Sequence, residues 1–99
     1  MSAYVIALIK VTDPDGYEAY KEMAPPSIAQ YGGRYIARAG RSEVFEGAPE
    51  AERFVLLEFD TFERAQEWWN SPEYEAAKSL RQRCATSNLM LVEGLAAPS

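Results

Sequence analysis

Two arginines in one predicted strand are the first candidates for binding an anion. Arg34 and Arg38 share a face in the alternation of a strand, so their guanidinium groups could hold a carboxylate or another planar anion together. Glu58 lies in a neighbouring predicted strand and is expected to pair with one of them, or to act as a general base if burial raises its pKa toward neutrality. Three interpretations remain open: a structural ion pair between Arg38 and Glu58, arginine contacts between subunits, and a ligand clamp.

Aromatic and hydroxyl side chains form the second group of candidates. Tyr20 lies on an apolar helix face, where it either packs in the core or donates a hydrogen bond to a carbonyl ligand. Trp69 and Tyr74 flank a predicted break between two helix pieces and could line a pocket there. Ser71 starts the second piece, either as an ordinary N-cap or as part of an anion site at the helix N-terminus. The predicted site is therefore Glu58 and Tyr20 as catalytic groups, with Arg34, Arg38, Trp69, Ser71 and Tyr74 binding the ligand.

The composition excludes several kinds of chemistry. The 99 residues include no histidine, which removes histidine general-base catalysis and imidazole ligands for haem or zinc. The single Cys84 cannot form an internal disulfide or a thiolate cluster. A net charge of −5 disfavours nucleic acid and anionic lipid surfaces. We therefore expect no metal, no organic cofactor, no nucleic-acid or membrane partner, and a cytoplasmic location, because neither a signal peptide nor a long apolar run is evident.

The elements that position these residues follow from changes in hydrophobic period. Residues 3–11 are nearly continuously apolar, and residues 53–60 are apolar on both faces except at Glu58, which is typical of covered strands. Strands are also predicted over 34–46, as a strand or a bent hairpin interrupted at Gly40, and over 89–93. A helix between Gly16 and Tyr31 is expected to kink or to split in two at Pro25-Pro26. A second helix begins at Phe62, breaks at residues 70–73 and restarts toward Cys84.

This order, β-α-β-β-α-β, predicts an α+β fold of the ferredoxin-like type. Its four-stranded antiparallel sheet would carry two helices on one face, in a single domain over residues 1–95 with a disordered tail over 96–99. Strands that are apolar on both sides leave the other face in need of a cover. A homodimer that packs sheet against sheet into an α+β barrel would bury that face, and a domain this small gains considerably from such a partner.

Several segments together resemble a known bacterial family. They are the first strand AYVIALIKV, the stretch D-P-x-x-Y-x-x-Y, the pair Pro25-Pro26, the segment Tyr31 to Tyr35 (YGGRY) and the segment Trp68 to Tyr74 (WWNSPEY). In this order and spacing they are similar to family thirteen-thirty of the domain-of-unknown-function series, within the dimeric α+β barrel group. The resemblance covers nearly the whole chain. It implies a ferredoxin-like fold and a homodimer, and it implies no particular reaction.

Distant members of that barrel group include cofactor-independent monooxygenases, haem-degrading enzymes and small isomerases, which is an analogy of fold. The haem branches generally use histidine, which this chain lacks. Two functional hypotheses follow. The chain either binds or converts a small aromatic or carboxylate-bearing metabolite without a metal or organic cofactor, or it is a non-catalytic dimeric module for structure or interaction.

Overall fold

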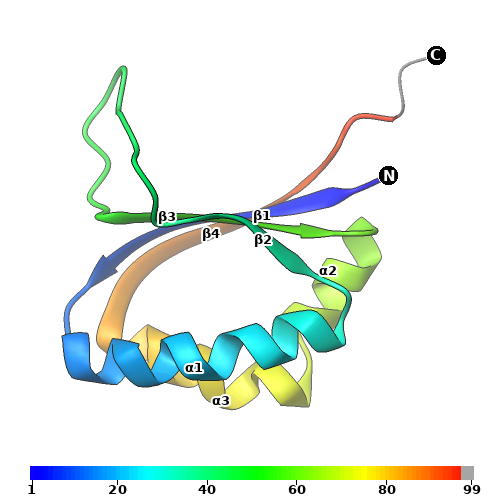
Figure 1. Ribbon diagram of the computed structural model, residues 1–99, viewed down its shortest axis with the longest axis horizontal. Coiled ribbons are helices and arrows are strands. Elements are labelled where there is room, and N and C mark those ends of the chain that lie inside the picture. Colours follow the sequence, from blue (N-terminus) through cyan, green and yellow to red (C-terminus); the bar gives the residue numbers. More distant parts are fainter. Residues whose placement is uncertain (97–99) are drawn as a thin grey trace.

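The chain folds into one antiparallel sheet with all its helices on one side (Figure 1). A computed structural model describes residues 1–96, so residues 97–99 of the predicted tail lie outside the described part. Its elements are β1 (Ala3–Val11), α1 (Pro14–Gln30), β2 (Arg34–Arg38), β3 (Arg53–Phe59), α2 (Phe62–Trp69), α3 (Pro72–Cys84) and β4 (Ala85–Glu93). The strand order is β2-β3-β1-β4, and every neighbouring pair is antiparallel. This arrangement confirms the predicted ferredoxin-like α+β class, with an open sheet.

The core lies between the sheet and the helices and follows the period-two pattern of the strands. Alternate residues of β1 and β3 are buried on the helix side, as the sequence predicts. These residues are Ala3, Val5, Ala7, Ile9, Val55, Leu57 and Phe59. Trp68 and Tyr74 are the largest fully buried side chains that pack against them from the helix layer. The covered face of the sheet is therefore the one that can form an enclosed site.

Helix α1 continues through its two prolines. The sequence predicts a kink or two short helices here, and the structure has one helix of 17 residues, so the prediction of two helices is wrong. Pro25 has no N–H to donate to the carbonyl of Lys21, four residues earlier. The Arg38 Nη2 atom of β2 donates to that carbonyl instead, at 3.3 Å. A side chain from the sheet thus supplies a donor that the helix backbone lacks.

The second helical region breaks where it was predicted to break. Helix α2 ends at Trp69 and α3 begins at Pro72, so three helices take the place of the predicted two. The Ser71 hydroxyl accepts from the Tyr74 N–H at 3.2 Å and caps α3. The Thr61 hydroxyl caps α2 in the same way by accepting from the Arg64 N–H at 3.0 Å.

Two strands differ in length from their predictions. Strand β2 ends at Arg38, and the prediction that it continues to residue 46 is wrong because the chain leaves the sheet at Ala39, whose φ is +54°. Strand β4 begins at Ala85 rather than residue 89, directly after α3, and pairs with β1 along its whole length. The sequence did not indicate this longer strand because the residues at the start of β4 are polar. A strand at the edge of a sheet does not require an apolar run.

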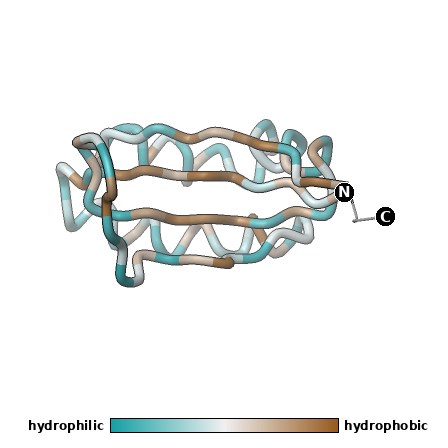
Figure 2. Tube along the Cα trace, turned by 90° about the horizontal axis from the view of Figure 1, so that it is seen from above, coloured by the Kyte–Doolittle hydropathy of each residue, from teal (hydrophilic) through white to brown (hydrophobic). Residues whose placement is uncertain are grey.

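The sheet face away from the helices is apolar. Tyr4, Ile6 and Leu8 of β1 lie in register with Phe54 and Leu56 of β3 and with Met90 and Val92 of β4. Met90 and Val92 are each 46 % exposed, and Ile36 of β2 is 47 % exposed. Figure 2 views the molecule from this side and shows the hydrophobic middle of the strands. In Figure 1 the loop between β2 and β3 and the chain after β4 both rise on this side of the sheet.

Candidate ligand-binding site

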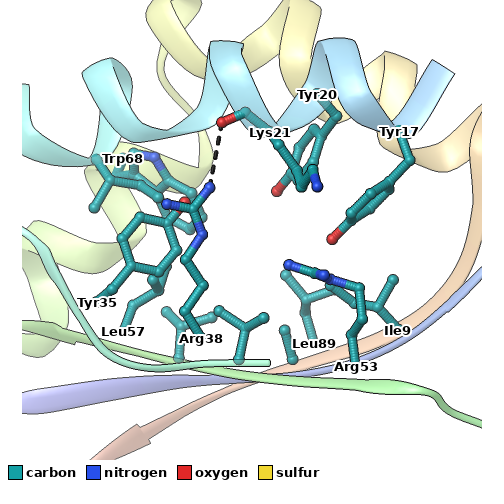
Figure 3. A pocket seen from close by; sticks show the side chains of 14 residues that line it. Ile9, Tyr17, Tyr20, Lys21, Tyr35, Arg38, Arg53, Leu57, Trp68 and Leu89 are labelled. Atoms are coloured by element: carbon teal, nitrogen blue, oxygen red, sulfur yellow. Dashed lines mark hydrogen bonds between the residues drawn. The ribbon is translucent and has the colours of Figure 1, made fainter. Parts of the chain in front are cut away.

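A cavity lies on the helix side of the sheet, under α1, and we call it the chamber (Figure 3). Its floor is formed by apolar side chains of the sheet, and its walls by tyrosines and cations. The residues that line it are Val5, Ala7, Ile9, Tyr17, Tyr20, Lys21, Ile28, Tyr35, Arg38, Arg53, Val55, Leu57, Trp68 and Leu89. The enclosed free volume is about 30 Å³, enough for one water molecule.

Three cations meet at the chamber, and no lining residue is acidic. The Arg53 guanidinium lies 5.2 Å from the centre of the Tyr17 ring, and its buried Nε atom has no hydrogen-bond partner. Arg38 stacks on the Tyr35 ring at 4.4 Å and reaches the Lys21 carbonyl (Figure 3). The Lys21 ammonium pairs with Glu18 at 2.9 Å. In a chain with a net charge of −5, this lining marks a local positive site.

A β-bulge separates the two arginines that were predicted to act together. In β2, Arg34 faces Glu58 and Arg38 faces Val55, and the register shifts between Tyr35 and Ala37. One extra residue reverses the alternation, so Arg38 points to the helix side and Arg34 to the opposite face. The prediction that they share one face is therefore wrong. Arg38 reaches the chamber alone.

Glu58 pairs with Arg34 on the face away from the helices. The Arg34 Nη2 atom lies 2.8 Å from the Glu58 Oε1 atom, and its Nη1 atom lies 3.7 Å from the Asp60 carboxylate. This confirms a pair with one of the two arginines, but the proposed pair with Arg38 is wrong. A hydrogen bond from Ser2 and the charge of Arg34 lower the pKa of Glu58, against the raised pKa that a general base needs. Glu58 is thus an ionised structural partner on the sheet face opposite the chamber.

This environment predicts the pH dependence of a Glu58→Gln variant. Because the pKa of Glu58 is lower in the folded than in the unfolded chain, the ionised group stabilises the fold above its ordinary pKa of 4.5. That contribution is lost as the pH falls through the lowered value. We expect Glu58→Gln to be less stable than wild type at pH 7, and the difference to close as the pH falls below the lowered pKa of Glu58, measured by urea unfolding. The exposed Glu50→Gln variant should follow wild type throughout, and a constant gap for Glu58→Gln would contradict the assignment.

Tyr20 and Tyr74 join the chamber to the interior of the helix layer. Their hydroxyl oxygens are 2.9 Å apart, and the Arg81 Nε atom donates to the Tyr74 hydroxyl over a long 3.5 Å. Burial, and then the neighbouring Tyr74, raise the pKa of Tyr20 far above its ordinary value. Tyr20 is therefore neutral at physiological pH and serves as a hydrogen-bond donor or acceptor rather than as a base.

The remaining predicted residues lie outside the chamber. Ser71 is buried and its hydroxyl donates to the Trp68 carbonyl at 2.7 Å, so its bonds are used within the helix junction. Tyr74 is fully buried and its ring centre lies 4.2 Å from that of Trp68. Trp69 is half-buried and lines an open groove between α2 and β4. The structure thus brings Tyr20 and Arg38 to one cavity and leaves the other five elsewhere.

Twelve of the fourteen residues that line the chamber were not among the predicted site residues. Of the polar ones, Tyr17 shares the apolar helix face of Tyr20, Tyr35 was given no role, and Lys21 and Arg53 look like solvated charges in the sequence. Arg53 had one usable signal, since it is the first residue of a buried strand and shares a face with Val55 and Leu57. Among residues 1–96, no three side chains of His, Cys, Asp or Glu gather to hold a metal ion. In the same part of the chain, no helix is both long and apolar enough to cross a bilayer.

Comparisons with known proteins agree with this architecture. Residues 2–95 match the family described as "Domain of unknown function (DUF1330)". No curated protein matches the sequence. A protein of unknown function from Rhodopseudomonas palustris superposes with a TM-score of 0.76 at 19 % identity, over 96 % of this chain and 83 % of that chain.

Two further solved structures share the fold at low identity. A cofactor-independent oxygenase from Streptomyces nogalater has a TM-score of 0.66 at 12 % identity, over 99 % of this chain and 98 % of its own. A dimeric protein of unknown function with a ferredoxin-like fold from Bacteroides fragilis has a TM-score of 0.64 at 16 % identity, over 94 % and 96 %. At these identities the likeness shows the fold and not the activity.

Proposed function

Since this chain belongs to the DUF1330 family, whose description gives no function, we propose its function from the chamber. The protein binds a small aromatic metabolite with a carboxylate, without a metal or organic cofactor, between its sheet and α1. The observation that carries the proposal is the meeting of Arg38, Arg53 and Lys21 over an apolar floor with no acidic residue in the lining. Guanidinium groups match the two oxygens of a carboxylate, and the tyrosines offer ring faces to an aromatic body.

Entry of the ligand requires one side chain to move. The closed chamber has about 30 Å³ of free volume, far less than a metabolite occupies. Arg38 is exposed and is held across the chamber by a long hydrogen bond of 3.3 Å to the Lys21 carbonyl. A carboxylate offers Arg38 a stronger, charge-assisted bond. We expect the ligand to draw Arg38 from this carbonyl and to open the chamber toward β2.

Tyr20 is the group we assign to the polar end of an aromatic ligand. Its hydroxyl lies in the chamber wall, and its raised pKa keeps the proton in place for donation to a carbonyl or phenol oxygen. Glu58 lies on the other sheet face, so it takes no part in this assignment.

Thermal unfolding with benzoate and 1-naphthoate tests the proposal. A ligand at a hundred times its Kd adds about 2.7 kcal/mol, which is about 10–20 °C in Tm for a domain of this size. We expect this shift for wild type and for Arg41→Met, an exposed arginine in the loop between β2 and β3. Arg53→Met should lose most of the shift, and neutral benzamide should give none. Equal shifts for Arg53→Met and Arg41→Met, or none with any aromatic acid, would reject the chamber as the site.

We also propose that the protein is a homodimer that packs the apolar sheet faces together. Seven apolar side chains from three strands share the face away from the helices, a surface that monomers rarely expose. The similar fold from Bacteroides fragilis is described as dimeric. The second candidate function, a non-catalytic dimeric module, rests on this face and on the small volume of the closed chamber. The ligand experiment separates the two candidates, since a module predicts no shift with any acid.

A further inference from the structure

Three side chains form a buried polar chain that runs from the chamber wall into the helix layer. The Tyr20 hydroxyl of α1 points into the chamber, toward the sheet (Figure 3). Behind it, the Tyr74 hydroxyl of α3 lies 2.9 Å from the Tyr20 oxygen, and the Arg81 Nε atom lies 3.5 Å from the Tyr74 oxygen. The distance between the two hydroxyls does not by itself decide which of them donates.

The Tyr74 hydroxyl proton has a single acceptor within residues 1–96. Tyr74 is fully buried, and among these residues its hydroxyl forms hydrogen bonds with Tyr20 and Arg81 alone. A guanidinium group has donors and no acceptor, so Arg81 can donate to the Tyr74 oxygen but cannot accept its proton. A buried O–H without an acceptor lowers stability. The Tyr74 hydroxyl therefore donates to the Tyr20 oxygen.

This direction leaves the proton of Tyr20 free to bond in the chamber. The Tyr20 oxygen accepts from Tyr74, and its hydroxyl has no further hydrogen-bond partner in the part of the chain that the structure describes. Burial and the neighbouring Tyr74 raise the pKa of Tyr20, so the proton stays on the oxygen at neutral pH. Because Tyr20 lines the chamber, that proton can be donated to an atom of a bound ligand.

Packing alone does not explain an arginine at position 81. The residue is 3 % exposed, and no acidic side chain among residues 1–96 forms an ion pair with it. Its guanidinium lies 5.9 Å from the ring centre of Tyr20 and 5.8 Å from that of Trp69, which offsets part of the cost of burial. Replacing a buried charge by an apolar side chain of similar volume is often neutral or stabilising. The donor that Arg81 gives to the polar chain provides a reason for its presence.

We propose that Arg81 is a positioning residue that, through Tyr74, keeps Tyr20 as the hydrogen-bond donor of the chamber. The inference rests on the function proposed for the chamber and narrows its ligand. Figure 3 shows Arg53 reaching into the same cavity from the sheet, opposite the Tyr20 hydroxyl. A ligand whose carboxylate binds Arg53 must then offer Tyr20 an acceptor, and a carbonyl oxygen does so. The ligand class is an aromatic acid with a second, ketone-like carbonyl group, and an amino group at that end is disfavoured because two donors would meet.

NMR of the free protein tests the direction of the hydrogen bond without a ligand. In protein with ¹³C-labelled tyrosine, the hydroxyl proton held between the two oxygens should exchange slowly with water and couple to ring carbons of Tyr74. Arg81→Lys also offers only donors and should keep this coupling. Arg81→Gln adds an acceptor for the Tyr74 proton, so the slowly exchanging proton should couple to the ring of Tyr20 instead. A wild-type proton that couples to Tyr20 would overturn the inference, even if no aromatic acid binds.

Ligand selectivity, measured by titration calorimetry, provides the second test. The compounds 4-acetylbenzoate and 4-isopropylbenzoate have nearly the same shape, but only the acetyl group accepts a hydrogen bond. We expect wild type, Arg81→Lys and the exposed control Arg83→Gln to bind the acetyl compound about fivefold more tightly, as one ordinary hydrogen bond allows. Tyr20→Phe and Arg81→Gln should bind the two compounds about equally. Wild type should bind 4-aminobenzoate more weakly than benzoate.

The inference and the proposed function fail in different ways. If no aromatic acid binds, the chamber is rejected as the site, while the proton coupling still decides the role of Arg81. If benzoate binds but wild type does not distinguish the acetyl from the isopropyl compound, the donor role of Tyr20 is overturned and the chamber remains the site. A purely structural Arg81 would lower the Tm of Arg81→Gln and leave the ratio of the two affinities unchanged, which would also overturn the inference.

Discussion

Replacing Trp68 with alanine is expected to lower the free energy of unfolding by about 3–5 kcal/mol. Trp68 is 1 % exposed, and its ring centre lies 4.2 Å from that of Tyr74 and 5.4 Å from that of Phe59. Its indole N–H donates to the buried Ser27 hydroxyl at 3.1 Å, which joins α2 to α1. The substitution removes the packing of both elements at once. Urea unfolding at neutral pH measures the loss.

The neighbouring Trp69 provides the matched control for this prediction. It has the same side chain, but it is half-buried, and its ring centre lies farther from its aromatic neighbours, 6.2 Å from that of Trp68 and 6.0 Å from that of Tyr74. Trp69→Ala should therefore cost clearly less stability than Trp68→Ala, because less apolar surface is lost. Equal losses for the two variants would show that the helix layer packs differently from the structure described above.

Replacing Leu56 with glutamate is expected to convert the proposed homodimer into a monomer. Leu56 lies in the middle of the apolar sheet face, opposite Ile6 in the β1–β3 register. In a dimer that packs these faces together, the substitution buries two unpaired carboxylates near each other, which costs several kcal/mol. Light scattering should then give the 11.1 kDa of one chain, where wild type gives twice that mass.

Ala76→Glu serves as the control for charge alone. Residue 76 is exposed on α3, on the other side of the molecule from the apolar face. The Ala76→Glu variant should therefore have the same mass in solution as wild type. A wild-type mass of one chain at micromolar concentration would contradict the homodimer, whatever the variants do. Circular dichroism should show that Leu56→Glu keeps its helices, since residue 56 points away from the core between sheet and helices.

Much of the fold follows from local signals in the sequence. The residues Val55, Leu57 and Phe59 alternate with a second apolar set, and this pattern predicts β3 as a strand that is covered on both faces. The break before α3 is equally local, because Ser71 as N-cap and Pro72 in the first turn define a helix start. Such features depend on neighbours within a few residues along the chain, so they can be read directly from the sequence.

The site was harder to predict because it depends on long-range pairing. A single extra residue at the bulge in β2 sends Arg38 to the chamber and Arg34 to Glu58, and nothing in the local sequence indicates it. The donor that takes the place of the missing Pro25 N–H comes from Arg38, which lies 17 positions from the carbonyl it contacts. The absence of a carboxylate beside Arg81 in the described residues likewise becomes visible only once the helices and β4 are placed together.

The bulge in β2 also affects how the molecule avoids aggregation. Strand β2 forms one edge of the sheet, where free backbone groups could pair with another chain. Its five residues are too few and too irregular for a long ladder, and the exposed Arg34 and Arg38 project to opposite sides. An approaching strand meets a cation on either face. Contacts between copies along this edge of the sheet are thereby discouraged.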